Sequence, residues 1–242
     1  ASQGKGTGIV GYNVQTAVET KHHLIVAHEV TNVGSDRHQL KRMAEQAREV
    51  LGTDGLTALA DRGYYAGEEI KACTDAGIVP LVPKVLTSSN RAAGRFDKSD
   101  FVYDARRDAF RCPAGEHAIR RFTTVENGMT IIKYWSSACP RCALRDRCTT
   151  GPYRRISRWE HEAVLDEMQR RLNRRPKAMQ LRRSTVEHPF GTIKSWMGAT
   201  HFLCRRLPRV SAEMSLHVLA YNLKRVMQIM GTEMLVRRLQ AA

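Results

Sequence analysis

Between residues 8 and 83 the chain alternates strand-like and helical segments, and this order most constrains its fold. Polar and apolar residues alternate over 8–19, and 23–31 is rich in β-branched residues, which is typical of two strands. Apolar side chains recur at helical spacing over 36–50. The order continues with a strand at 56–61, a helix at 67–76 and a strand at 78–83. It predicts an α/β fold.

The middle of the chain, residues 84–157, is rich in Ser, Asn, Gly, Arg and Asp and predicts an insertion. Within it we expect short strands at 101–103 and 130–135. Helical spacing returns at 160–173, 177–196 and 210–230, and the last of these helices is amphipathic and expected to pack on the sheet. We therefore expect three parts: the first part of the core at 1–83, the insertion at 84–157 and the helical remainder at 158–242.

The charge balance predicts a polyanionic partner. Lys and Arg number 39 and Asp and Glu 24, for a formal net charge of +15. Such a chain fits nucleic acid better than a membrane surface, and no run of eighteen apolar residues predicts a transmembrane helix. The six cysteines lack the dense, even spacing of a secreted disulfide framework, so a cytoplasmic location is expected.

Four of these cysteines crowd into the insertion. Cys112, Cys139, Cys142 and Cys148 have the spacing C-x26-C-x2-C-x5-C. Cys-x2-Cys presents two thiolates on one tight turn, and four thiolates form a closed structural Zn²⁺ site. The alternatives from the sequence are free thiols or a disulfide.

Asp61 ends a predicted buried strand and precedes Arg62-Gly63. In open α/β sheets reactive residues collect at the carboxyl ends of strands, so Asp61 is a candidate catalytic carboxylate. Asp before Arg-Gly is also common in turns, and the sequence leaves this structural alternative open.

Glu187 lies on a predicted helix with Arg183 four residues before it and Lys194 seven residues after it. At 100° per residue the three fall within about 40° of one another, so two cations share a face with a carboxylate. An ordinary solvated face with an ion pair has the same spacing. Pro189 and Gly191 are expected to interrupt the helix, which favours a positioning role over a plain surface.

Three segments together resemble DDE transposases of bacterial insertion sequences, and the resemblance covers essentially the whole chain. They are Asp-Arg-Gly-Tyr-Tyr at 61–65, Val-Glu-His-Pro-Phe-Gly-Thr-Ile-Lys at 186–194 and Leu-His-Val-Leu-Ala-Tyr-Asn-Leu-Lys-Arg at 216–225. Arg183-x3-Glu187-x6-Lys194 matches the family's Tyr-x2-Arg-x3-Glu-x6-Lys signature, with Gln180 in place of the Tyr.

The resemblance implies a ribonuclease H-like mixed sheet flanked by helices, with the cysteine-containing insertion between the second and third catalytic carboxylates. Two aspartates and a glutamate would hold two Mg²⁺ ions, with Asp61 as the second carboxylate and Glu187 as the third. Arg183 and Lys194 would bind DNA phosphates. The first aspartate has no clear match. Only two strands precede the helix before Asp61, so the first strand is expected to be absent. The alternatives for the first carboxylate are Glu19 and Asp36, and Asp36 is interpreted rather as a cap of the helix at 36–50.

The sequence and its resemblance thus predict a transposase that cleaves and transfers DNA strands at element ends. Its expected partner is double-stranded DNA, both the element ends and the target. The resemblance implies a homodimer on DNA. Two other functions stay open: a non-catalytic DNA-binding remnant of a transposase, and a metal-dependent nuclease without strand transfer.

Overall fold

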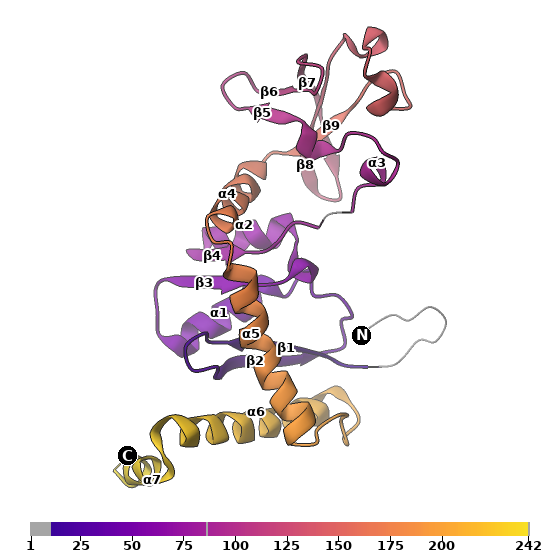
Figure 1. Ribbon diagram of the computed structural model, residues 1–242. Coiled ribbons are helices and arrows are strands. Elements are labelled where there is room, and N and C mark those ends of the chain that lie inside the picture. The colour runs from indigo at the N-terminus through magenta and orange to yellow at the C-terminus, as the bar shows by residue number, and fades with distance from the viewer. Residues whose placement is uncertain (1–10, 86, 242) are drawn as a thin grey trace. The chain divides into compact units, whose positions relative to one another are not determined.

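The computed structural model describes residues 11–85 and 87–241, which divide into two compact units (Figure 1). The first unit contains the described residues of 1–84 and 164–242, and the second contains those of 85–163. Helices accompany antiparallel and parallel strands in the first unit, and the second is built on an antiparallel sheet. The predicted α/β class is therefore confirmed.

The first two strands pair as predicted. β1 (Asn13–Val18) and β2 (Ile25–Thr31) form an antiparallel ladder. Residues 8–10 of the expected first strand lie outside the described residues. The β-branched side chains of β2 are suited to a pleated, half-buried surface, and Ile25 and Val30 are buried there.

The next elements form a parallel β-α-β unit. β3 (Leu56–Leu59) pairs in parallel with β4 (Ile78–Leu81), and α2 (Gly67–Asp75) connects them. α1 (Leu40–Leu51) precedes β3, and α4 (Glu162–Asn173) contributes Met168 to the same core. The buried members of this core are Leu40, Ala44, Ala60, Ile70, Cys73, Ile78, Val82 and Met168.

The two ladders are not joined into one mixed sheet. β1 pairs with β2 and β3 pairs with β4, and no ladder links β1 to β3 among the described residues. The described strands therefore form two separate ladders and not the continuous sheet of a ribonuclease H-like core. In the described ranges, no strand lies between the edges of β1 and β3.

A long helix crosses both ladders. α5 (Ala178–Gly191) contacts β1 and β3, and Figure 1 shows it running across the strands. Pro189 lies inside α5 and does not end it, whereas the α-helix ends at Gly191, the second residue at which an interruption was predicted. A π-helix (Thr192–Trp196) follows directly. Single π turns within helices occur most often at functional sites.

The helix after this turn covers the first ladder. α6 (Leu207–Met230) contacts β2, which confirms the prediction that it packs on a sheet. Asn222 links the two: its Oδ1 accepts a hydrogen bond from the Ile25 N–H at 3.0 Å, and its Nδ2 donates to the Ile25 carbonyl at 2.8 Å. α7 (Thr232–Gln240) was not predicted. The buried core here contains Ile25, Val30, Ile193, Val210, Met214, Val218 and Tyr221.

The second unit is an antiparallel sheet in chain order. Its strands are β5 (Val102–Asp104), β6 (Ala109–Arg111), β7 (His117–Glu126), β8 (Met129–Trp135) and β9 (Ile156–Trp159). Asn127 and Gly128, both with positive φ, join β7 to β8, as the tight turns of hairpins require. The core holds five buried residues: Phe101, Phe110, Ala118, Tyr134 and Ile156.

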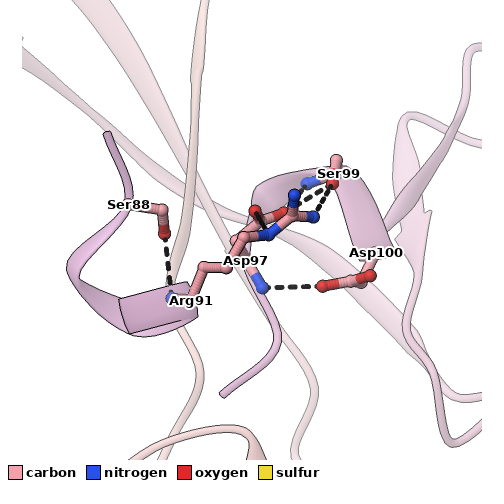
Figure 2. Close-up of polar contacts among 5 residues, drawn as sticks. All are labelled: Ser88, Arg91, Asp97, Ser99 and Asp100. Atoms are coloured by element: carbon pink, nitrogen blue, oxygen red, sulfur yellow. Dashed lines mark hydrogen bonds and ion pairs between the residues drawn. The ribbon is translucent and has the colours of Figure 1, made fainter. Parts of the chain in front are cut away.

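A polar network fixes the segment that leads into this sheet (Figure 2). Ser88 caps the short helix α3 (Ser89–Ala92) by accepting from the Arg91 N–H, and the Arg91 guanidinium pairs with Asp97 at 2.7 Å. Asp97 accepts from the Ser99 N–H and its own N–H donates to Asp100, each at 2.7 Å. The Ser99 hydroxyl bond, offset in part by burial, lowers the pKa of Asp97, with help from Arg91. These contacts hold residues 88–100 together ahead of β5.

In the part of the chain that the structure describes, no helix is both long and apolar enough to span a membrane.

Candidate active site

Asp61 stands just beyond the end of β3, where the backbone turns into a short 3₁₀ helix (Arg62–Tyr64). Its Oδ1 accepts the Gly63 N–H at 2.8 Å, and its Oδ2 accepts the Arg182 guanidinium at 2.6 Å. Asp61 is therefore a turn residue, as one interpretation of the sequence expected, and it also lies at the carboxyl end of a strand. The side chain is 46% exposed, so it is anchored and still accessible.

Asp36 is held by two amides from β1. Its Oδ1 accepts hydrogen bonds from Asn13 Nδ2 and Gln15 Nε2, both at 2.7 Å. Gln15 is buried, and its Oε1 accepts the Tyr64 hydroxyl. The interpretation of Asp36 as a helix cap was wrong, because α1 begins at Leu40 without a side-chain cap.

Asp36 and Asp61 are neighbours across Gly63. A methyl group added at Gly63 would stand 3.0 Å from Asp61 Oδ1 and 3.5 Å from Asp36 Oδ2. The two oxygens are therefore separated by no more than the sum of these distances, about 6.5 Å. Burial and the charges of both aspartates raise the pKa of the Tyr64 hydroxyl, against a smaller opposing effect of Arg182. Two carboxylates thus share one polar site at the end of β3.

Gly63→Ala tests this spacing. The added methyl group would push on Asp61 Oδ1, so we expect nicking of substrate DNA to fall roughly tenfold or more while the free energy of unfolding changes by less than about 1 kcal/mol. Gly55→Ala is the matched control, because a methyl group there has no heavy atom within 4 Å. Equal nicking rates for the two variants would contradict the crowded geometry.

Glu187 lies on the exposed surface of α5, with 68% of its side chain exposed. Its carboxylate pairs with Arg183 at 3.9 Å, as the four-residue spacing predicts. It is Arg182, one residue earlier, that reaches Asp61. The ammonium group of Lys194 lies 5.8 Å from the centre of the Phe190 ring. Because Lys194 belongs to the π-helix, the rotation of about 100° per residue does not hold all the way from Glu187 to Lys194.

Glu19 is a turn residue in the structure. Its Oε2 accepts the Lys21 N–H at 2.8 Å and its Oε1 accepts the His22 N–H at 2.5 Å. Burial raises the pKa of Glu19, but the backbone N–H bonds outweigh it and lower the pKa below its ordinary value. Both oxygens of Glu19 are therefore engaged by the turn between β1 and β2.

A slot of about 340 Å³ lies between β1 and β3. Residues of β1 and β3 line it from the sides, and α1 and α5 contribute Met43, Ala47, Arg182, Thr185 and other residues. The slot is partly open to solvent, so it is a groove in the surface of the first unit and not a void in its core. The Thr185 hydroxyl is buried and has no hydrogen-bond partner among the described residues.

Thr185→Val removes a buried hydroxyl that stabilises nothing in the described structure. We expect the free energy of unfolding to stay constant or rise by up to about 1 kcal/mol, measured by urea denaturation. Thr74→Val is the matched comparison, because its hydroxyl donates to the Ile70 carbonyl at 2.9 Å, and we expect a loss of about 1 kcal/mol. A larger loss for Thr185→Val than for Thr74→Val would contradict the unpaired hydroxyl.

The four insertion cysteines are all free thiols, and all four line one pocket in the second unit. Across the described residues, no three His, Cys, Asp or Glu side chains are arranged so that they could hold a metal ion.

Sequence reasoning missed several side chains of the site: Asn13, Gln15, Tyr64 and Arg182. Gln15 follows Asn13 at a polar position of the alternating pattern in β1, so nothing in that pattern marked Gln15 as buried. Nothing in the local pattern distinguished Arg182 from Arg183.

Comparison with protein families now adds to this geometry. A family model described as a transposase DDE domain matches residues 1–223. The chain belongs to the DDE-domain transposases. Searches of curated proteins and of solved structures each found no significant match. The matched range includes Asp36, Asp61 and Glu187, so the carboxylates described above all lie within the DDE domain.

DDE transposases act on DNA and generally use divalent metal ions. Membership of the family therefore gives the chain DNA as its substrate class and an enzyme of the transposase and nuclease kind as its activity class.

Proposed function

We propose that this chain is the catalytic portion of an insertion-sequence transposase, which cleaves DNA strands at element ends and transfers them to target DNA. The observation that carries the proposal is the pair Asp36 and Asp61 beside the end of β3, within a DDE domain. Asp61 is anchored by Gly63 and Arg182 and stays accessible. A site for a phosphodiester needs such fixed carboxylates with room for substrate.

The donor set fits Mg²⁺. Asp36 Oδ2 and Asp61 Oδ1 are hard oxygen donors that lie close together, and Mg²⁺ is held by a few carboxylates together with water and phosphate oxygens. When bound, two such ions activate the attacking hydroxyl and stabilise the leaving oxygen in an in-line displacement. We assign Asp61 and Glu187 as ligands, with Asp36 as the neighbouring carboxylate. Arg182 would keep Asp61 oriented throughout.

A further strand would fit in the slot between β1 and β3. A strand there would pair with the free edges of both β1 and β3, and would complete one mixed sheet of the ribonuclease H-like type. If it ran parallel to β3, its carboxyl end would lie beside Asp61. That is where the first aspartate of the family is expected, and residues 1–10 contain no acidic residue.

Arg183 and Lys194 would bind DNA phosphates next to the carboxylates. Both side chains are exposed, and the net charge of +15 favours a polyanion. Binding through phosphates releases counterions, so we propose strongly salt-dependent DNA binding. A homodimer on paired ends is part of the same proposal.

A duplex carrying the element ends, labelled at each 5′ end, tests the function. We expect Mg²⁺-dependent nicks at the ends, and joined products when target DNA is added. Nicks without joined products would indicate a metal-dependent nuclease, and binding without nicks would indicate a non-catalytic remnant. A structural zinc ion on the insertion cysteines is a separate proposal that has no part in this chemistry.

A further inference from the structure

The fold of the second unit brings four cysteines from two distant loops to one pocket. Cys112 directly follows β6, whereas Cys139, Cys142 and Cys148 lie in the connection between β8 and β9. All four thiols line this pocket together. Their proximity also shows in electrostatics, since the other three cysteines each raise the pKa of Cys148, after the larger effect of burial.

The backbone around these cysteines forms tight turns. The Cys142 N–H donates to the Cys139 carbonyl at 3.2 Å, so the Cys-x2-Cys segment closes on itself. The Leu144 N–H donates to Cys142 Sγ at 3.4 Å. On the other loop, the Gly115 N–H donates to the Cys112 carbonyl at 2.9 Å. Both loops therefore hold their cysteines on tight turns.

Two arginines add positive charge to the same pocket. Arg145 and Arg154 both line it, and Arg154 lowers the pKa of Cys148 against the effect of burial. Arg154 Nε is buried and has no hydrogen-bond partner among the described residues. A buried guanidinium nitrogen without an acceptor is costly, and a nearby thiolate would supply the acceptor. This unpaired donor is independent of the cysteine spacing and points to an anionic group in the pocket.

The pocket has an apolar shell that adjoins a small core. Phe96, Phe101 and Leu144 are among its lining residues, and the Phe96 N–H donates to the Arg147 carbonyl at 2.9 Å, which ties the incoming segment to the cysteine loop. The buried cluster beside the pocket contains Phe101, Phe110, Ala118, Tyr134 and Ile156, and Cys112 and Cys148 pack against it. A small unit of this kind gains stability from a metal staple.

We propose that Cys112, Cys139, Cys142 and Cys148 bind one structural Zn²⁺ ion. The thiols surround the pocket without meeting at one centre, since no three metal-binding side chains among the described residues yet form a site. Binding therefore turns the four side chains toward a common point. Each thiol releases its proton to solvent, and the resulting tetrathiolate zinc complex carries two negative charges, which Arg145 and Arg154 balance.

Zinc content measured on the full chain, purified without added metal, tests the proposal. We expect about one zinc per chain by elemental mass spectrometry, and a loss of most of it in Cys142→Ser. Cys204→Ser is the matched control, because Cys204 is an exposed cysteine of the first unit and should leave the zinc content unchanged. Less than about 0.2 zinc per chain in the wild-type protein, or equal losses in both variants, would overturn the proposal.

Cobalt substitution covers the case in which Cys142→Ser fails to fold. After removal of metal with a chelator, Co²⁺ added to the wild-type chain should give thiolate charge-transfer absorption and the intense visible bands of a tetrahedral site, both saturating at one equivalent. Weak octahedral bands without thiolate absorption would overturn the proposal. Neither readout involves DNA, so a chain that binds zinc but fails to nick would contradict only the proposed function.

Discussion

Asp61→Ala is expected to reduce the rate of Mg²⁺-dependent nicking by at least about 10³-fold. Asp61 is the carboxylate that the structure fixes most firmly at the strand end, through Gly63 and Arg182. Its removal would take away a metal ligand and leave the Arg182 guanidinium without its partner. Single-turnover nicking of a labelled duplex, at saturating protein, measures the effect on the cleavage step.

Asp54→Ala is the matched control for this prediction. Asp54 is an exposed aspartate just before β3, at the opposite end of the strand from Asp61. We expect it to nick at the wild-type rate within about twofold, as surface substitutions usually have small effects. Thermal unfolding of both variants separates loss of chemistry from loss of fold. A rate for Asp61→Ala within tenfold of wild type would remove Asp61 from the site.

Adding a strand to the slot between β1 and β3 should have the second large effect. We expect a chain extended at its N-terminus by a strand that fits the slot to melt about 5 °C or more above the present chain, because the strand fills the slot and pairs two edges that are open in the described residues. If it also brings an aspartate beside Asp61, nicking should rise by at least about 100-fold. Calorimetry and the nicking assay measure the two effects separately.

Two variants of the extended chain separate these contributions. Replacing the added aspartate by alanine should keep the higher melting temperature and remove the gain in nicking. A proline at the centre of the added strand should remove both, because it cannot donate to a ladder. An extension that changes neither stability nor nicking would show that the slot receives no strand, and would favour Asp36 as the first carboxylate.

Local periodicity predicted much of the core. The elements at 13–18, 25–31, 56–59 and 67–75 have the expected type, because each carries its own pattern of apolar residues. The position of Asp61 could be predicted for the same reason, since an apolar run followed by a charged residue marks a strand end.

Long-range pairing explains what the sequence did not reveal. Asp36 was interpreted as a helix cap because it precedes a helix, yet its partners Asn13 and Gln15 lie more than twenty residues earlier. In the second unit, the pair Asn127-Gly128 is typical of a hairpin turn, although no hairpin was predicted there. The preceding strand was missed because most of its residues are exposed and show no clean alternation.

Metal-directed backbone cleavage tests whether a catalytic metal ion binds at the end of β3. Fe²⁺ bound in place of Mg²⁺ generates hydroxyl radicals that cut the nearby chain when ascorbate and peroxide are added. We expect cuts in the chain next to Asp36, Asp61 and Glu187. These cuts should disappear with excess Mg²⁺ and be absent in Asp61→Ala. Cuts confined to other regions, or a pattern unchanged in Asp61→Ala, would contradict a catalytic metal site at the end of β3.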